Sequence, residues 1–327
     1  MRRRAFIGIV GSAVAWSSVV LAQQPKLPVV GYLGADSPEL FASRLDAFRR
    51  GLSSQGFDEG RNVSIEYRWA HGRNDRLPAL AAELVQRGVT VMVSPGSVAA
   101  SLAARDATST IPIVFENGAD PIETGLVKSL NEPGGNVTGV TSLNAQVAPK
   151  RLELLHEIFP AARHFALLVN PTNRVNADAT AAAVRAAAGR RKLELTIVNA
   201  STEDEIASAF ESLRSLRVAG LVVANETYFA LRGGQLAELA SRFSVPAVHQ
   251  AREFVLAGGL MSYGGDVAQS HSQAGVYTGR VLRGEKPANL PVQLVTAVRL
   301  TINLKAAGSL ALTMPASLLA RADEIIE

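Results

Sequence analysis

The stretch VVGYLGADSPELFASRLDAFRRGL, residues 29–52, places a short apolar run directly before an amphipathic one. The apolar run 29–33 ends at Gly34 and is typical of a strand buried in a parallel sheet. Large apolar side chains then recur at helical spacing, at Phe41, Leu45, Phe48 and Leu52. A strand followed at once by a helix is the repeating unit of an α/β fold.

The same strand–helix order continues through the rest of the chain. In the first half we expect further strands at 63–67, 89–93 and 111–115, and helices at 77–85 and 97–106. In the second half we expect strands at 165–169, 193–198, 220–223 and 245–248, and helices at about 176–190, from 202, and at 228–243. Corresponding strands keep a nearly constant offset. The pattern predicts an α/β fold of two doubly wound parallel-sheet lobes joined by crossover hinge strands.

Three extended stretches are candidates for crossing between the lobes. Residues 136–141 are rich in β-branched side chains and follow a turn at 132–135. Residues 259–263 lead into an expected helix at 267–282, and residues 291–300 follow a turn at 284–287. We therefore expect residues 27–140 plus about 264–290 to form the first lobe, and residues 141–263 plus about 291–327 to form the second.

The N-terminus has the three-part plan of a secretory signal. Arg2, Arg3 and Arg4 form a basic start, residues 6–21 are largely apolar, and small residues at the usual cleavage offsets end at Ala22. We expect residues 1–22 to be removed on export, because the apolar run is short for a membrane anchor. The order Arg3-Arg4-Ala5-Phe6-Ile7 also resembles a twin-arginine signal, so Tat-like and Sec export both stay open.

The composition excludes several classes of protein. With 47% hydrophobic and 19% charged residues, the chain is globular rather than disordered. Without the three N-terminal arginines, 30 basic side chains stand against 29 acidic ones, which leaves no basic stripe for nucleic acid. The absence of cysteine excludes disulfides, thiol chemistry and a cysteine-linked lipid anchor. No histidine pair has metal-site spacing and no phosphate-loop, dinucleotide or nucleophile-elbow motif occurs, so we expect no metal, no cofactor and no catalytic residue.

Motifs spread over nearly the whole chain are similar to those of one family. They lie at residues 62–69, 75–78, 109–115, 133–139, 150–155, 170–173, 252–254, 258–264, 302–305 and 320–324. Through these motifs, the chain resembles the ABC transporter substrate-binding protein family, whose members have the type I periplasmic-binding fold. The branch that it resembles includes tryptophan- and tyrosine-linked binding proteins. The resemblance implies two lobes, three crossings and a ligand held between the lobes, and it does not specify the solute.

Ligands of open α/β sheets bind beyond the carboxyl ends of the strands. In the first lobe, the polar or small residues at these ends are Gly34, Asp36, Ser37, Ser94, Gly96, Ser97, Asn117 and Asp120. In the second lobe they are Asn170, Asn173, Asn225, Tyr228, Gln250 and Glu253, and Tyr263 lies in the expected second crossing. We expect the ligand-binding residues to come from this set.

Some of these residues have a more specific expected role. The loop 94–97 precedes a helix, so its free N–H groups can hold a carboxylate or phosphate, although Ser97 can equally be only a helix cap. Asp36, Asp120 and Glu253 are candidates to receive an amino group. Alternatively, Asp36 is a turn residue, Asp120 has its position fixed by the proline that follows it, and Glu253 pairs with Arg252. Tyr228 and Tyr263 can stack on a ring or donate a hydroxyl, or can be ordinary half-buried tyrosines.

The sequence therefore predicts a periplasmic receptor that delivers a small molecule to an ABC importer in the inner membrane. An amino acid, or another aromatic or carboxylate-bearing solute, is the expected cargo, and the protein is expected to be a monomer without a lipid anchor. The alternatives are an exported sensory ligand-binding protein and, less favoured, an enzyme that uses the interlobe cleft. A DNA-binding repressor of the same fold is disfavoured, because the export signal occupies the place of a helix-turn-helix.

Overall fold

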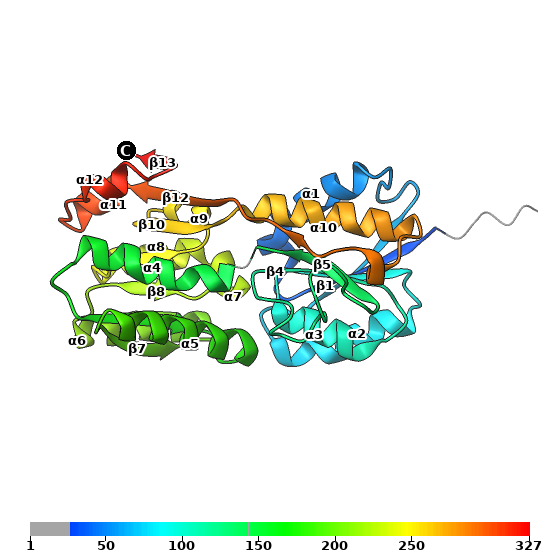
Figure 1. Ribbon diagram of the computed structural model, residues 1–327, viewed down its shortest axis with the longest axis horizontal. Coiled ribbons are helices and arrows are strands. Elements are labelled where there is room, and N and C mark those ends of the chain that lie inside the picture. The colour runs from blue at the N-terminus through cyan, green and yellow to red at the C-terminus, as the bar shows by residue number, and fades with distance from the viewer. Residues whose placement is uncertain (1–26, 143) are drawn as a thin grey trace, which may run out of the picture.

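The computed structural model describes residues 27–142 and 144–327. It shows two lobes that lie end to end along the long axis of the molecule (Figure 1). The expected export signal, residues 1–22, lies outside the described residues. No helix of the described ranges is long and apolar enough to cross a bilayer.

The first lobe is built on a six-stranded sheet in which all pairings are parallel. Its strands are β1 (Val29–Gly34), β2 (Ser64–Trp69), β3 (Val91–Pro95), β4 (Ile113–Asn117), β5 (Val137–Thr141) and β11 (Gln293–Leu294), in the spatial order β11-β5-β4-β3-β1-β2. Helices α1 (Pro38–Ser53) and α10 (Val267–Leu282) cover one face, and α2 (Leu77–Gln86) and α3 (Val98–Ala107) cover the other (Figure 1). Two short 3-10 turns, η1 (Asn74–Arg76) and η2 (Pro287–Asn289), complete the lobe.

Both faces of the first sheet are apolar, as the continuous run 29–33 predicted. Val30 and Tyr32 pack into the core under α1 and α10, whereas Leu33 packs into the core under α2 and α3. Helices α1 and α10 approach each other closely because glycine lies at their contact. A Cβ added to Gly275 would overlap the backbone of α1, so only glycine permits this packing.

The second lobe has a seven-stranded sheet in the order β13-β12-β10-β9-β8-β6-β7. Its strands are β6 (His164–Val169), β7 (Glu194–Asn199), β8 (Leu221–Val223), β9 (Ala247–His249), β10 (Met261–Gly265), β12 (Val298–Asn303) and β13 (Glu324–Ile326). Among the strands described, only β10 and β12 pair in the antiparallel direction. Helices α4 (Asn144–Ile158) and α5 (Arg174–Arg190) pack on one face, and α6 (Glu203–Leu216) and α8 (Gly233–Arg242) on the other. Three short helices, α9 (Arg252–Leu256), α11 (Leu304–Ser309) and α12 (Ala316–Leu319), lie at the periphery. The predicted fold class, two α/β lobes with parallel sheets, is confirmed.

The helix expected at 228–243 is divided into two. Helix α7 (Thr227–Leu231) ends at Arg232, whose backbone φ of −108° departs from the helical value, and α8 begins at Gly233. The tandem Gly233-Gly234 has low helix propensity, which favours a break at this point. At this break, the Arg232 side chain pairs with Asp36 of the first lobe.

The chain passes between the sheets after β5, after β10, and between β11 and β12. Residues 259–263 were expected to be the second crossing, but Met261–Gly265 belong to the second sheet, and the crossing follows them into α10. The second lobe was expected to resume at about residue 291. Instead, Gln293–Leu294 pair with β5 in the first sheet, so the return follows β11.

Candidate functional site

A small cavity lies between the two lobes and is lined by polar residues from both. We call it the interlobe cleft, and its volume is about 30 Å³. From the first lobe and the crossings it is lined by Arg44, Gly96, Glu116, Asn117, Gly118, Ser142, Val267, Ser270 and His271. From the second lobe it is lined by Asn225, Thr227 and Gln250. It lies at the carboxyl ends of β4, β8 and β9, where ligands of doubly wound sheets bind.

Arg44 is the cation of the cleft. It projects from the second turn of α1 and is 9% exposed. Its guanidinium lies 5.5 Å from the centroid of the Phe41 ring. Within the described residues it makes no hydrogen bond and no ion pair, and burial lowers its pKa although Glu116 opposes that shift. A buried guanidinium without a partner is costly, so this group is suited to bind an anion that enters the cleft.

Glu116 is the acid of the cleft, at the end of β4. Its Oε2 accepts a hydrogen bond of 2.9 Å from the Gly96 N–H. Burial raises the pKa of Glu116 to about 7, although the Arg44 charge and the Gly96 N–H oppose this shift. The carboxyl group therefore changes between its neutral and ionised forms near physiological pH, and a cation in the cleft would favour the ionised form.

His271, on the first turns of α10, lies beside Glu116 in the wall of the cleft. Its Nδ1 lies 2.9 Å from the Val267 carbonyl oxygen and 3.5 Å from Glu116 Oε2. Because both neighbours are acceptors, Nδ1 carries the proton, and burial lowers the pKa of His271 to about 3, so the ring is neutral. Its Nε2 is then an acceptor, and this atom is buried with no hydrogen-bond partner among the described atoms. The opposite lobe offers a similar group, since the buried Gln250 Oε1 also has no partner there.

The neutral form of Glu116 predicts a pH-dependent stability difference. Between its ordinary pKa of 4.5 and its folded value of about 7, the folded protein binds more protons than the unfolded chain, so stability falls as pH rises through that window. Glu116→Gln, which mimics the neutral acid, should therefore gain up to about 3 kcal/mol over the natural protein between pH 4.5 and pH 8. Urea denaturation of both proteins across this range measures the difference.

Titration of His271 does not contribute to the difference in stability between Glu116→Gln and the natural protein, because both proteins retain this histidine. A stability difference of the same size at pH 4.5 and pH 8 would contradict a raised pKa at Glu116.

A second set of polar contacts joins the lobes beside the cleft. Arg232 of the second lobe forms a 2.7 Å ion pair with Asp36 of the first, and these side chains are 12% and 4% exposed. The same guanidinium lies 3.6 Å from the centroid of the Tyr228 ring and also pairs with Glu203 at 3.1 Å. We call Asp36, Tyr228 and Arg232 the interlobe clasp. It is assisted by a hydrogen bond of 3.0 Å from Asn74 Nδ2 to Thr172 Oγ1.

The structure distributes the fifteen sequence-predicted site residues among several places. Those that line the interlobe cleft are Gly96, Asn117, Asn225 and Gln250. Asp36 and Tyr228 lie in the clasp instead. Asp120 lines a neighbouring cavity, and Glu253 is exposed at a groove that it shares with Gln250. The Tyr263 carbonyl accepts a 2.7 Å hydrogen bond from the buried Arg151 at the crossing, while its ring packs against the core of the second lobe.

The remaining predicted residues hold the loops that surround the cleft. Ser37 and Ser97 cap α1 and α3, and Ser94 bonds to the Ser101 hydroxyl. Asn170 Oδ1 accepts from the Thr172 N–H, and Asn173 donates to Glu226. Gly34 makes room for the Trp69 ring, which a Cβ would overlap.

Eight of the twelve residues that line the cleft were not predicted from the sequence, among them the three ionisable ones, Arg44, Glu116 and His271. Arg44 and His271 lie inside helices, whereas only loops after strands were considered. Glu116 offered a signal, since it is a charged residue that continues the apolar strand 111–115. Neither helix position carries a comparable signal, because a charged or polar residue within an amphipathic helix is ordinary.

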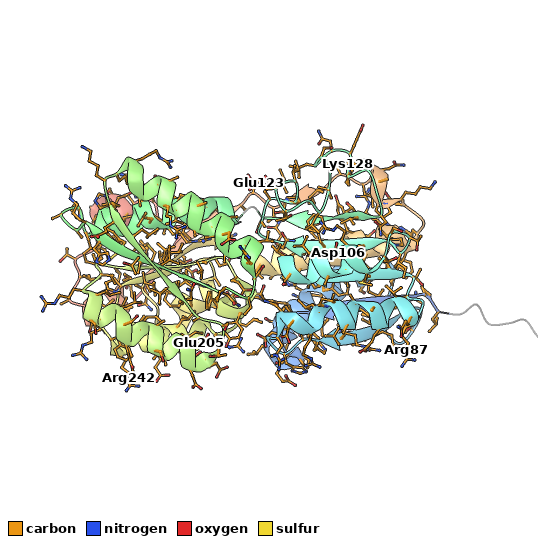
Figure 2. All side chains as sticks on the ribbon, turned by 90° about the horizontal axis from the view of Figure 1, so that it is seen from below. Arg87, Asp106, Glu123, Lys128, Glu205 and Arg242 are labelled. Carbon is orange, nitrogen blue, oxygen red and sulfur yellow. The ribbon has the colours of Figure 1, made fainter. Side chains whose placement is uncertain are left out.

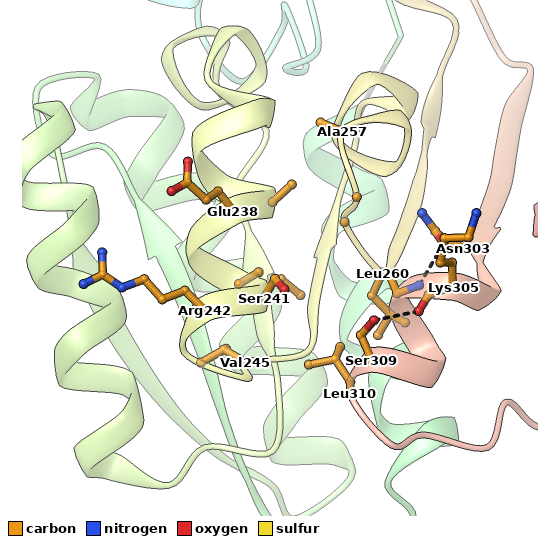
Figure 3. Close-up of a pocket in the computed structure, with 16 residues that line it drawn as sticks. Glu238, Ser241, Arg242, Val245, Ala257, Leu260, Asn303, Lys305, Ser309 and Leu310 are labelled. Atoms are coloured by element: carbon orange, nitrogen blue, oxygen red, sulfur yellow. Dashed lines mark hydrogen bonds between the residues drawn. The ribbon is translucent and has the colours of Figure 1, made fainter.

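A larger cavity of about 650 Å³ lies at the far end of the second lobe. Figure 3 shows that residues of α8 form one side of it, and Asn303, Lys305, Ser309 and Leu310 the other. Two of its polar side chains are bonded locally, since Ser309 Oγ donates to the Lys305 carbonyl and Asn303 Nδ2 to that of Val255, and no polar atom of its lining is buried without a partner among the described residues. The smaller interlobe cleft is therefore the candidate functional site, because the buried His271 Nε2 and Gln250 Oε1 in its lining have no partner among the described residues. Among residues 27–142 and 144–327, no group of three His, Asp or Glu side chains is placed to hold a metal ion.

A family model described as ABC transporter substrate binding protein matches residues 36–326. The chain belongs to this family. Among curated relatives, this substrate-binding protein is similar to a "Tyrosine-binding protein" of Clostridioides difficile (strain R20291), with 27% identity over 256 residues that cover 78% of this chain and 73% of the relative. The family is one of binding proteins rather than enzymes.

Two crystal structures resemble this substrate-binding protein over 92% of its length and 100% of theirs. One is a conserved domain protein of Vibrio cholerae O1 biovar El Tor, with 27% identity and a TM-score of 0.84. The other is a domain from Streptococcus pneumoniae in complex with L-Trp, with 26% identity and a TM-score of 0.82. The family expected from the sequence motifs is thus confirmed.

Proposed function

We propose that this substrate-binding protein captures a solute that carries a carboxylate and an ammonium group, an α-amino acid, between its two lobes. The observation that carries this proposal is Arg44, a buried guanidinium that lines the interlobe cleft and has no hydrogen-bond partner within the described part of the chain. A carboxylate can accept two parallel hydrogen bonds from such a group. Glu116 lines the same cleft and, once ionised, receives the ammonium.

The relatives support the same class of ligand. One is named for tyrosine binding, and one solved structure holds L-Trp. Both ligands are zwitterions with one carboxylate and one ammonium group, which matches the opposite charges of Arg44 and Glu116. The neutral His271 Nε2 and the Gln250 Oε1 are acceptors suited to further N–H donors of the ammonium.

The solute is captured by closure of the two lobes. Ligand shifts the population from an open to a closed arrangement, in which the interlobe clasp forms. The closed protein, located in the periplasm after removal of its export signal, delivers the solute to the permease of an ABC importer. This proposal follows from the family and from the expected signal at residues 1–22.

Thermal denaturation of the mature protein with a panel of ligands tests the proposal. We expect L-amino acids to raise the melting temperature, with a stabilisation of about 4 kcal/mol at a thousandfold excess over Kd. Matched amino-acid amides, which lack the carboxylate, should give none of this stabilisation. Stabilisation by the amides equal to that by the acids would contradict the assignment of Arg44. Chemical conversion of the bound amino acid would contradict a receptor without turnover.

A further inference from the structure

The far end of the second lobe, away from the interlobe cleft, gathers exposed cations from several segments of the chain. At this end the parallel strands β6, β7, β8 and β9 begin, and the helices α5, α6 and α8 end. Figure 2 shows Arg242 toward this end of the molecule and Arg87 toward the opposite end. We call this set of cations the basic edge, and it consists of Arg163, Arg190, Lys192, Arg214, Arg217 and Arg242.

Backbone hydrogen bonds place the segments of the basic edge side by side. The Glu194 N–H donates to the Arg163 carbonyl at 2.7 Å, which joins the start of β7 to the start of β6. The Ala219 N–H donates to the His164 carbonyl at 2.9 Å, and β8 in turn pairs with β9. The segments that follow one another across the edge are therefore those that carry Lys192, Arg163, Arg217 and Arg242.

The basic edge carries an excess of positive charge. Its six cations are exposed and form no ion pair within the described ranges, whereas the nearby Arg191 pairs with Glu153 at 3.3 Å and is not counted. Against these six cations the same segments hold three exposed acids, which leaves a net charge of +3; the acids are Glu194, Glu211 and Glu238. The balance of 30 basic and 29 acidic side chains gives no sign of this excess, because folding brings together cations that are far apart in the chain.

Two cations of the basic edge occupy backbone positions that favour glycine. Lys192 follows α5 with a φ of 55°, and Arg217 ends α6 with a φ of 51°. Helices α2 and α10 are followed by Gly88 and Gly284 in the same left-handed region, where a residue without Cβ avoids strain. The helix dipole accounts for cations in a last helical turn, such as Arg190, but it does not require them at strained positions beyond that turn. The charges of Lys192 and Arg217 therefore point to a role outside the helices themselves.

Apolar side chains among the cations indicate which anionic partner fits. Leu216 lies between Arg214 and Arg217 in the chain and is 43% exposed. The Arg242 guanidinium lies 5.4 Å from the centroid of the Phe243 ring, which is half-buried. Cations mixed with exposed aliphatic and aromatic groups suit the boundary between the headgroups and the acyl chains of a bilayer, whereas the phosphate backbone of a nucleic acid offers no apolar phase.

We infer that the basic edge docks this protein on the surface of a membrane that contains anionic phospholipid. The charges of the edge attract the headgroups, and Leu216 enters the interface between headgroups and acyl chains. The interlobe cleft lies at the carboxyl ends of the strands, opposite the basic edge, so it stays open to solvent when the edge is docked. The inference goes beyond the proposed function and does not depend on it, because no residue of the basic edge lines the cleft.

Sedimentation with vesicles tests the inference on the full mature protein without solute. We expect binding to vesicles of phosphatidylcholine and phosphatidylglycerol in equal parts, no binding to phosphatidylcholine alone, and loss of binding at high salt. Each cation near an anionic surface contributes about fivefold to affinity, so Lys192→Gly combined with Arg217→Gly should weaken binding about 25-fold. The melting temperature of this double variant should not fall, because glycine suits the left-handed backbone at both positions.

The matched control is Arg50→Gln combined with Arg87→Gln, which removes the same charge from exposed positions of the first lobe and should change vesicle affinity less than twofold. Equal losses in the two double variants would overturn the inference, because they would show attraction by total charge rather than docking by the basic edge. Failure of the natural protein to bind the anionic vesicles, or equal binding to the neutral ones, would overturn it as well. Tighter binding to duplex DNA than to anionic vesicles would overturn the assignment of a membrane as the partner.

Discussion

Arg44→Met is expected to weaken amino-acid binding by at least 100-fold. The guanidinium is buried at the interlobe cleft and supplies charge-assisted hydrogen bonds to the ligand carboxylate. Hydrogen bonds to a charged group contribute about 1.5–3 kcal/mol, and the variant also leaves the carboxylate without a counter-charge. Methionine keeps much of the apolar stem that packs near Phe41. Isothermal titration calorimetry with the best ligand of the panel measures the loss.

A second readout shows whether Arg44 binds ligand or only supports the fold. Without ligand, the buried guanidinium has no hydrogen-bond partner within the described residues, so its removal should leave the melting temperature unchanged or raise it. Arg50→Met is the matched control, since Arg50 is exposed on the same helix, and it should leave both Kd and melting temperature unchanged. A large fall in the stability of the ligand-free Arg44→Met protein, with Kd unaltered, would contradict the role proposed for Arg44.

Breaking the interlobe clasp is expected to raise Kd about 10-fold without removing any ligand contact. Asp36→Asn leaves the mostly buried Arg232 with only the exposed Glu203 as counter-charge, and under the proposed closure this pair across the lobes belongs to the closed arrangement alone. The open arrangement is therefore favoured, and apparent affinity falls with the fraction of protein that can close. Stopped-flow measurement should show that most of the change lies in a faster dissociation rate.

A double-mutant cycle with Asp36→Asn and Arg232→Met isolates the ion pair from other effects of each substitution. If the clasp acts as a unit, the double variant should have nearly the same Kd as either single variant. Glu203→Gln is the control, because Glu203 pairs with Arg232 within the second lobe and is 64% exposed. Strictly additive effects of the two clasp substitutions would show that they do not act through the pair.

The strand and helix positions follow from the sequence because they depend on local periodicity. The run 29–33 packs against helices on both faces, and Phe41, Leu45, Phe48 and Leu52 are buried along α1. The break between α7 and α8 and the short strand β11 are weaker local patterns. Gln293–Leu294 form a strand only because β5 offers them a partner far away in the chain.

The candidate site was harder to predict than the fold. Of the residues predicted at the carboxyl ends of strands, Gly96, Asn117, Asn225 and Gln250 line the interlobe cleft that we propose as the ligand site. The prediction also included Asp36 and Tyr228, which the structure places in the clasp. It left out Arg44 and His271, which reach the cleft from helices that cover the first sheet.

By itself, the sequence determined the class of fold, the alternation of strands and helices along most of the chain, and the family, because each depends on patterns within a few neighbouring residues or on motifs along the chain. Only the tertiary structure decided which polar groups meet. Asp36 and Arg232 are separated by 196 positions and belong to different lobes, yet they form one buried ion pair. Arg44 became a candidate binding residue only when its burial and its missing partner were known. Both properties depend on long-range packing, which local periodicity does not encode.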